Sequence, residues 1–192
     1  SQFGSMGKPY NAGIAAANGV ECATLAGLGF TSADDGLMGH QGFVGAHLPS
    51  GGAVTGPDLA LDSYKFPDNK YKLHACCHGL HPMIEALQAS EAAAGVPLDD
   101  IKSFSLSTNP RWLAVCDIKR PRTGLEVKFS YNWLAGMTLR GDNTGDDRLF
   151  TDTIAGEAEL GRFAERISVT GDDKLTDLQA RGEISLTDGR AI

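Results

Sequence analysis

The pattern of the chain changes at Pro97, and this change limits the possible fold more than any other feature of the sequence. Before Pro97 the clearest segments are helical in character. After it, short runs with strand-like alternation follow one another and are separated mostly by turn residues. Helices grouped before and between such strands predict an α+β fold with a largely antiparallel sheet and packed helices.

The predicted strands all lie beyond Pro97. In residues 125–129, Leu125, Val127 and Phe129 alternate with two charged residues, as expected for a strand with one buried face. The other predicted strands are residues 101–107, 112–118, 166–170 and 178–187.

The predicted helices are recognised by their ends. An Ala- and Gly-rich helix is predicted over residues 11–28, with Gly29 as its C-cap. A second helix is predicted to begin at Pro82, a residue favoured in the first turn, and to end near Gly95. Further helical segments are predicted up to Leu37 after a Thr-Ser cap, at 130–139 and at 146–164, and residues 39–58 are predicted to be loop.

The two ends suggest that the chain is a fragment. There is no Met at position 1, and residues 181–186 form a strand pattern followed by an Asp-Gly turn. A hairpin partner is expected after this turn, yet only Ala191 and Ile192 follow Arg190. A strand cut so short leaves an edge unpaired, so a longer protein is expected; the alternative is a frayed tail.

Composition excludes some functions. A net charge of −7 and a pI near 5.1 argue against a nucleic-acid partner, because such proteins usually carry a basic face. No apolar run approaches the roughly 20 residues that cross a bilayer, so no membrane insertion is expected. No secretory signal opens the chain, and the four cysteines are scattered apart from one adjacent pair. These features favour a reduced, cytoplasmic location.

The segment YKLHACCHGLHP, residues 71–82, is unusually rich in reactive side chains. It holds these ionisable or metal-ligating residues: Lys72, His74, Cys76, Cys77, His78 and His81. A zinc site is one interpretation, but adjacent cysteines point apart in most backbone conformations and no second ligand pair lies at zinc-finger distance. The acidic loop DNTGDD, residues 142–147, lacks calcium-loop spacing and is interpreted as a solvated loop.

A second interpretation of this segment is an anion pocket. The segment leads into the predicted N-terminus of the Pro82 helix, where free N–H groups and the helix dipole attract negative charge. Together with the Lys72 ammonium and His78 or His81, this predicts a cationic pocket suited to a carboxylate. The alternative is structural: two small buried cysteines, with histidines that cap the helix or lie on the surface. Lys8, held in extended geometry before Pro9, raises the same choice between anion binding and a surface role.

Three segments taken together resemble the MmgE/PrpD family, which includes 2-methylcitrate dehydratases, cis-aconitate decarboxylases and an iminodisuccinate epimerase. They are GKPYNAGIAAANGVECATLAGLGFTS, YKLHACCHGLHPMIEAL and EVKFSYNWLAGMTLRG, which span roughly residues 4–141. The resemblance implies a mostly helical domain followed by a smaller α+β lid domain, with the active site between them. Residues 1–60 would then be a lead-in from the helical domain and residues 61–192 the lid domain.

The resemblance also implies roles for particular residues. The family's lysines fall on Lys8 and Lys72, and its histidine before the helix-starting proline falls on His81. These three are the expected catalytic residues. His78 and Cys77 are expected to contact substrate, as are Trp133 and Tyr131, since either can take the family's aromatic position after the FS pair. At Trp133 the tyrosine hydroxyl would be lost, and with it a proton-donor role.

The function implied by the resemblance is chemistry on small di- or tricarboxylates. A proton next to a carboxylate is removed, and water is eliminated, carbon dioxide is lost or the proton returns on the other face, which corresponds to a lyase or an isomerase. No metal or organic cofactor is implied, and family members are homodimers. Catalytic histidines and an acidic residue would come from the helical domain, so the chain alone is expected to be inactive. The alternatives are a non-catalytic carboxylate-binding or dimerisation domain and a zinc-binding module.

Overall fold

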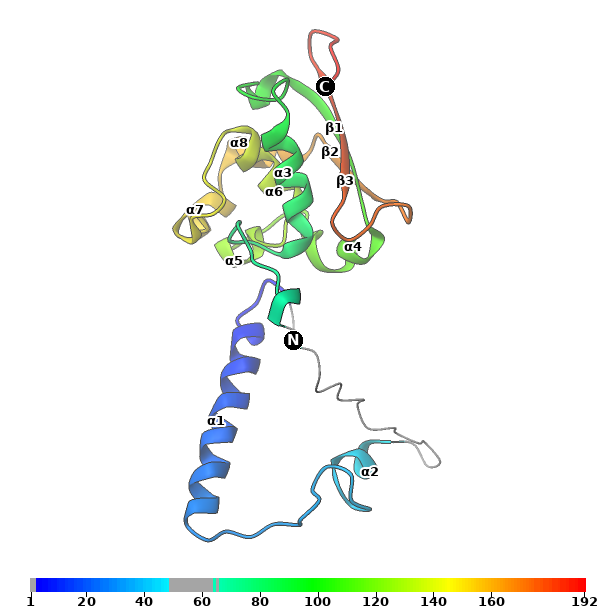
Figure 1. The fold of residues 1–192 in the computed structure, drawn as a ribbon. Helices are drawn as coiled ribbons and strands as arrows, with labels where there is room; N and C mark the ends of the chain where they lie inside the picture. The colour runs from blue at the N-terminus through cyan, green and yellow to red at the C-terminus, as the bar shows by residue number, and fades with distance from the viewer. Residues whose placement is uncertain (1–2, 49–63, 65) are drawn as a thin grey trace. The chain divides into compact units, whose positions relative to one another are not determined.

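The computed structural model describes residues 3–48, 64 and 66–192, and the chain forms two compact units (Figure 1). One comprises residues 9–70 and is called the N-terminal unit. The other comprises residues 1–8 and 71–192 and is called the sheet unit. The boundary predicted between residues 60 and 61 falls outside the described residues.

Helix α1 (Gly7–Gly27) confirms the predicted Ala- and Gly-rich helix but begins four residues earlier than predicted, so Lys8 lies in its first turn and not in extended geometry. Gly29 has a φ of 88°, its N–H donates to the Ala26 carbonyl at 3.0 Å, and the Phe30 N–H donates to the Leu25 carbonyl at 3.0 Å. This bond pattern is a Schellman motif, which requires the left-handed conformation that glycine adopts without strain. Among the described helices, none is both long and apolar enough to cross a bilayer.

Two predictions for the rest of the N-terminal unit are wrong. The helix predicted to end at Leu37 is a series of turns, in which the Met38 N–H donates to Asp35 Oδ1 at 2.8 Å. The predicted loop contains a short helix, α2 (Phe43–His47), while its residues 49–58 lie outside the described part of the chain. A single 3₁₀ turn, η1 (Phe66–Asp68), precedes the sheet unit.

The sheet has the order β2-β1-β3, with β1 (Ile101–Thr108) in the centre. Strand β2 (Ile167–Gly171) pairs with β1 in parallel, and β3 (Ala180–Leu186) pairs with it antiparallel. Phe104 lies opposite Ile167 on one side and Ile184 on the other. The predicted α+β fold is confirmed, and its sheet is mixed, with antiparallel pairing on the β3 side and parallel pairing on the β2 side.

Two predicted strands are helices. Residues predicted as strand 112–118 lie largely in α4 (Pro110–Cys116), where the Asn109 side chain accepts from the Arg111 N–H at 3.1 Å and Pro110 stands in the first turn. Residues predicted as strand 125–129 begin in α5 (Gly124–Val127), capped by Thr123 Oγ1 at 3.2 Å from the Glu126 N–H. Local capping outweighs apolar alternation in such short segments.

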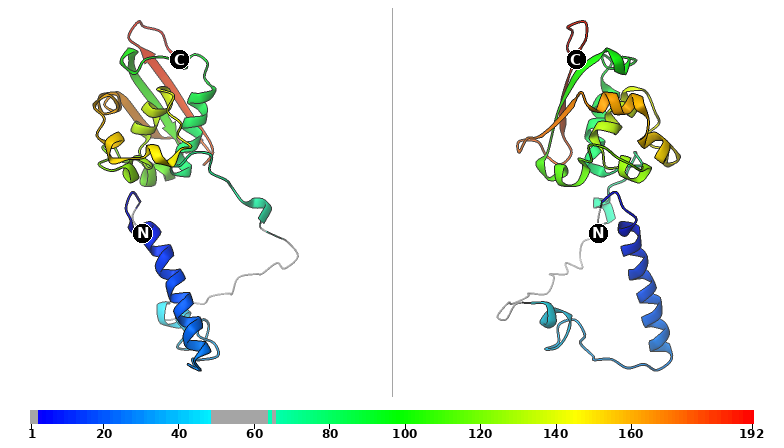
Figure 2. Two further views of the ribbon diagram at one scale, coloured as in Figure 1. Left: turned by 90° about the vertical axis from the view of Figure 1, so that its left-hand side faces the viewer. Right: turned by 180° about the vertical axis from the view of Figure 1, so that it is seen from behind.

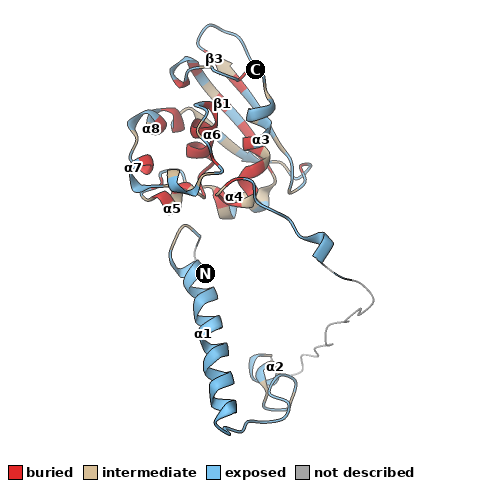
Figure 3. Cartoon of the chain, turned by 60° about the vertical axis from the view of Figure 1, so that its left-hand side comes forward, coloured by how far each residue is buried: buried red, intermediate tan, exposed pale blue. Residues whose placement is uncertain are grey.

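Helices α3 (His81–Ala89), α6 (Tyr131–Leu139) and α8 (Ala158–Ala164) cover one face of the sheet (Figure 2). Every residue of α6 is buried, and buried residues gather around it in Figure 3. A Cβ added to Gly136 would lie 2.8 Å from Leu160 and 2.9 Å from Phe163, so this glycine allows α8 to approach closely. The remaining short elements are η3 (Leu98–Asp100), η4 (Asp147–Leu149) and α7 (Asp152–Ala155).

The predicted Asp-Gly turn after β3 is confirmed. Gly189 has a φ of 91°, and the Leu186 N–H donates to the Arg190 carbonyl at 2.8 Å. Ile184 and Ile192 exchange two backbone hydrogen bonds of 2.9 and 2.8 Å. The last three residues therefore return along the outer edge of β3.

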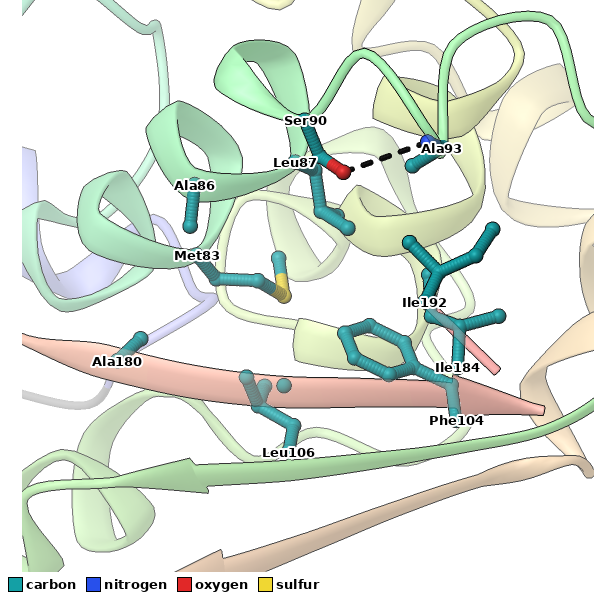
Figure 4. Close-up of a pocket in the computed structure, with 11 residues that line it drawn as sticks. Met83, Ala86, Leu87, Ser90, Ala93, Phe104, Leu106, Ala180, Ile184 and Ile192 are labelled. Atoms are coloured by element: carbon teal, nitrogen blue, oxygen red, sulfur yellow. Dashed lines mark hydrogen bonds between the residues drawn. The ribbon is translucent and has the colours of Figure 1, made fainter. Parts of the chain in front are cut away.

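A shallow apolar hollow of about 90 Å³ lies between α3 and β3 (Figure 4). Met83 and Leu87 line it from the helix, and Phe104 and Ile184 line it from the sheet. Its lining includes no ionisable side chain, and the Ser90 hydroxyl accepts a hydrogen bond from the Ala93 N–H at 3.3 Å. This hollow offers no partner for a carboxylate.

Candidate functional site

The histidine- and cysteine-rich segment is held by backbone hydrogen bonds from two loops. The Ala75 N–H donates to the Thr144 carbonyl at 2.8 Å, and the Cys77 N–H donates to the Lys128 carbonyl at 2.9 Å. The segment then forms a 3₁₀ turn, η2 (His78–Leu80), which runs directly into α3. Histidines three and seven positions apart in sequence therefore come together at the start of a helix.

Three histidine rings meet at this point. The His78 and His81 rings stack nearly parallel, with centroids 4.9 Å apart and planes 9° apart. The His74 ring meets His81 edge-on, with a centroid distance of 5.0 Å. His74 and His81 are buried, and His74 Nδ1 forms a 2.7 Å hydrogen bond with the buried Thr144 hydroxyl. We call His74, His78 and His81 the histidine cluster.

His81 has a free hydrogen-bonding atom inside this cluster. Its Nε2 is buried and has no hydrogen-bond partner in the described part of the chain. Burial lowers the pKa of His81 to about 4, and the neighbouring His74, His78 and Lys72 act in the same direction. The imidazole is therefore uncharged at neutral pH, which corrects the expectation that His81 adds positive charge. A buried polar nitrogen without a partner is a group that a ligand can satisfy.

The three cysteines of the site differ in the pKa of their thiols. The pKa of Cys77 is held below its usual value, although burial opposes this. The causes are a hydrogen bond from the Cys116 thiol, an N–H from Gly79 and the charges of Lys72 and Lys8. The pKa of Cys116 is raised by the same hydrogen bond and by burial. Burial raises the pKa of Cys76 to about 12. The interpretation as inert buried cysteines thus fits Cys76 and Cys116, but Cys77 is held in an environment that stabilises a thiolate.

Lys72 and Lys8 supply positive charge to this region. Both are exposed, and both lower the pKa of Cys77 through their charges. The Lys8 ammonium also lies 4.8 Å from the centroid of the Phe3 ring and 5.5 Å from that of Phe129. The structure therefore brings Lys8, from the start of the chain, near enough to Cys77 for its charge to act there together with that of Lys72.

The two predicted aromatic residues are buried and have different surroundings. Tyr131 is fully buried, and its hydroxyl donates to the Gly79 carbonyl at 2.9 Å and lies 3.1 Å from the Thr108 hydroxyl. The Tyr131 hydroxyl thus helps to hold the 3₁₀ turn that contains His78 and Gly79. Trp133 is also buried, and its indole N–H donates at 3.0 Å to the carbonyl of Ile154 in α7. None of its described contacts joins it to the histidine cluster.

Sequence reasoning missed three residues of the site: Gly79, Cys116 and Thr144. Thr144 belongs to the DNTGDD loop, whose other residues are exposed or half-buried as expected of a solvated loop; Thr144 is the exception, buried against His74. Cys116 lies 39 positions after Cys77 in the printed sequence, and no local pattern joins them. Gly79, between two histidines in a helix-forming segment, gave a signal, since glycine there often marks a close approach.

The charge around Cys77 gives a prediction for its thiol. Replacing Cys116 by Ala removes the main hydrogen bond to the Cys77 sulfur, and Lys72→Met removes a favourable positive charge. Both changes disfavour the thiolate, so the pKa of Cys77 is expected to rise, more in Cys116→Ala than in Lys72→Met. Titration of ¹³Cβ-labelled cysteine by NMR measures this directly, with Lys102→Met on β1 as the charge control. An unchanged Cys77 titration in both variants would contradict the assignment.

The zinc interpretation has no geometric support in residues 3–48, 64 and 66–192. No three His, Cys, Asp or Glu side chains among them converge in a way that could hold a metal ion. Within the histidine cluster, His78 is stacked on His81 and His74 meets His81 edge-on.

The chain matches a known protein family. The description MmgE/PrpD C-terminal domain fits residues 74–192, which is more than half of the chain. The match begins at the histidine cluster and includes the whole mixed sheet. No curated protein matches the chain.

Proposed function

Because the chain belongs to the MmgE/PrpD family through its C-terminal domain, we propose that it is the lid part of an enzyme acting on small di- or tricarboxylates. The proposed reaction removes a proton next to a carboxylate, as in a dehydratase, a decarboxylase or an epimerase. The observation that carries this proposal is the buried Nε2 of His81, which has no hydrogen-bond partner among the described residues and lies within the influence of the Lys72 charge. It offers a neutral hydrogen-bonding nitrogen next to a cation, and a carboxylate-bearing substrate needs both.

In this proposal Lys72 and Lys8 bind substrate carboxylates. A positive charge next to a carboxylate makes the adjacent C–H more acidic, because the negative charge that develops on proton removal spreads onto oxygen atoms close to the ammonium group. Lys72 is the better placed of the two, since its charge acts on His81 as well as on Cys77. Both side chains are exposed, so a substrate can reach them.

His81 is proposed to assist proton movement, with His78 and Cys77 in contact with the substrate. A neutral imidazole can accept a proton or donate a hydrogen bond, whereas an imidazolium can only donate. A bound carboxylate would compete with the Cys77 thiolate for the charge of Lys72. Substrate binding should therefore favour the protonated thiol, and the site takes up a proton as the substrate enters.

The remaining catalytic groups are proposed to come from a helical domain that this chain contacts, and the assembly is proposed to be a homodimer without a bound cofactor. Helix α1 supports such a contact, because Tyr10, Ile14 and Val20 are exposed along it. Large apolar side chains on an exposed helix are typical of a surface that packs against other helices. In this proposal the chain by itself has no activity.

A test of the proposal measures the step that all three reactions share. The chain is combined with the helical domain and incubated in D₂O with a panel of carboxylates, including citrate and succinate derivatives, while ¹H NMR follows the protons next to each carboxylate. At least one member of the panel is expected to lose its proton signal or to be converted. Binding of citrate at the histidine cluster without any exchange would instead support a non-catalytic carboxylate-binding domain.

A further inference from the structure

A second hollow lies away from the histidine cluster, between α6, α8 and the segment after α4. Its volume is about 530 Å³, within the range of small-molecule sites. Ala158 and Gly161 on α8 leave room for it, since a Cβ added to Gly161 would meet no atom within 4 Å. We call this hollow the α8 groove. None of the residues of the histidine cluster lines it.

Positive charge predominates around the α8 groove. Its lining includes Lys119, Arg120 and Arg162 but only one acidic residue, Glu165. Glu165 lies 3.7 Å from Arg120 in a highly exposed pair, which is a weak interaction. Arg162 has no ion-pair partner among the described residues. On a chain with a net charge of −7, such a local excess of cations is unusual and favours an anionic ligand.

Lys119 contributes less charge than the two arginines. Its ammonium lies 2.5 Å from Asp117 Oδ1, and this carboxylate lies outside the lining of the groove. The two guanidinium groups are therefore the main anion-binding candidates. A guanidinium presents paired N–H donors that match two oxygens of a phosphate at once.

Asn132 adds a second, independent sign of an absent ligand. It lines the groove and is only 4% exposed, and its side-chain N–H donates to the Ala164 carbonyl at 2.8 Å. That bond identifies Oδ1 as the free acceptor, and Oδ1 has no hydrogen-bond partner among the described residues. A buried acceptor is normally satisfied by protein, water or ligand. A ligand with a hydroxyl group beside its anionic group could supply the donor directly or through water.

We propose that the α8 groove binds the phosphate group of a small hydroxyl-bearing phosphate ester, with Arg162 and Arg120 holding the phosphate and Asn132 facing the hydroxyl. This site lies beyond the proposed carboxylate chemistry, because it shares none of the cationic residues of that chemistry. A phosphate monoester carries close to two negative charges at neutral pH, which matches two guanidinium groups better than a single carboxylate does.

The test titrates the ¹⁵N-labelled 192-residue chain with ribose 5-phosphate, inorganic phosphate and citrate at equal ionic strength, and follows the indole N–H signal of Trp133, which lines the groove. Trp133→Phe identifies this signal against that of Trp112. The expected result is a saturable shift that is tightest with ribose 5-phosphate and weaker with inorganic phosphate. Citrate binding at this signal as tightly as ribose 5-phosphate would overturn the assignment to phosphate.

Four variants separate the groove from general effects of charge and folding. Arg162→Ala is expected to weaken the binding of ribose 5-phosphate at least about tenfold, since a charge-assisted hydrogen bond is lost. Gly161→Leu fills the groove and should abolish binding of ribose 5-phosphate, although every cationic side chain of the groove is kept. Glu165→Gln should tighten binding, which a misfolded variant cannot do. Arg181→Ala, which removes an exposed arginine on β3, should leave the affinity for ribose 5-phosphate unchanged.

The outcomes decide the proposal in either direction. A saturable Trp133 shift that is lost in Gly161→Leu, weakened in Arg162→Ala and kept in Lys72→Met supports a phosphate site separate from the histidine cluster. Absence of a saturable shift up to millimolar ribose 5-phosphate, or equal weakening by Arg181→Ala and Arg162→Ala, would overturn it.

Discussion

Replacing Lys72 by Ala is expected to lower kcat/KM for the carboxylate substrate by about a hundredfold to a thousandfold, the loss seen when one group that stabilises developing negative charge is removed. Lys72 is exposed, so the variant should fold normally. Its charge acts on both Cys77 and His81, and His81 cannot replace it, because burial keeps His81 neutral. Steady-state kinetics of the chain combined with the helical domain measure the effect.

Lys70→Ala is the matched control for this prediction. Lys70 lies two positions earlier, is exposed and belongs to the N-terminal unit. Its replacement should leave the rate unchanged, and Lys72→Arg should retain part of the activity because it keeps the charge but not the shape of the ammonium. Turnover of Lys72→Ala within about threefold of the parent protein would show that Lys72 has no catalytic role.

Gly79→Ala is expected to have the largest effect on stability, a loss of about 2 to 3 kcal/mol in the free energy of unfolding. An added Cβ would lie 2.6 Å from Cε3 and 2.7 Å from Cγ of the Trp112 indole, so the ring or the turn must move. Movement of the turn also disturbs the 2.9 Å hydrogen bond from Tyr131 to the Gly79 carbonyl and the N–H donated to Cys77. Urea denaturation followed by circular dichroism measures the change.

Two further variants test the cause of this loss. Gly161→Ala places the same methyl group in open space within a helix and is expected to be neutral or to stabilise the chain by up to about 1 kcal/mol. Trp112→Ala removes the ring that Gly79→Ala would meet, so the double variant should lose less stability than the sum of the two single variants. Additive losses would show that contact with Trp112 is not the reason for glycine at position 79.

The fold could be predicted where local pattern and global packing agree. The Schellman end at Gly29, the start of α3 near Pro82, and all three strands of the sheet follow from glycine, proline and apolar patterns. Prediction failed for α4 and α5, because their apolar alternation was outweighed by Asn109 and Thr123, which cap the helices. In segments of four to seven residues both signals are weak, and a single capping bond decides.

The candidate site, like the fold, could be predicted only in part from the sequence. The sequence by itself determined the family and the reactive segment around residues 71–82, because residue types and their spacing are local properties of the chain. Only the tertiary structure decided that His81 is neutral with a free Nε2, that Cys77 meets Cys116, and that Tyr131 lies beneath the site. Burial and the distances between charges set the pKa of a group, and both depend on residues distant in sequence that meet only once the chain is folded.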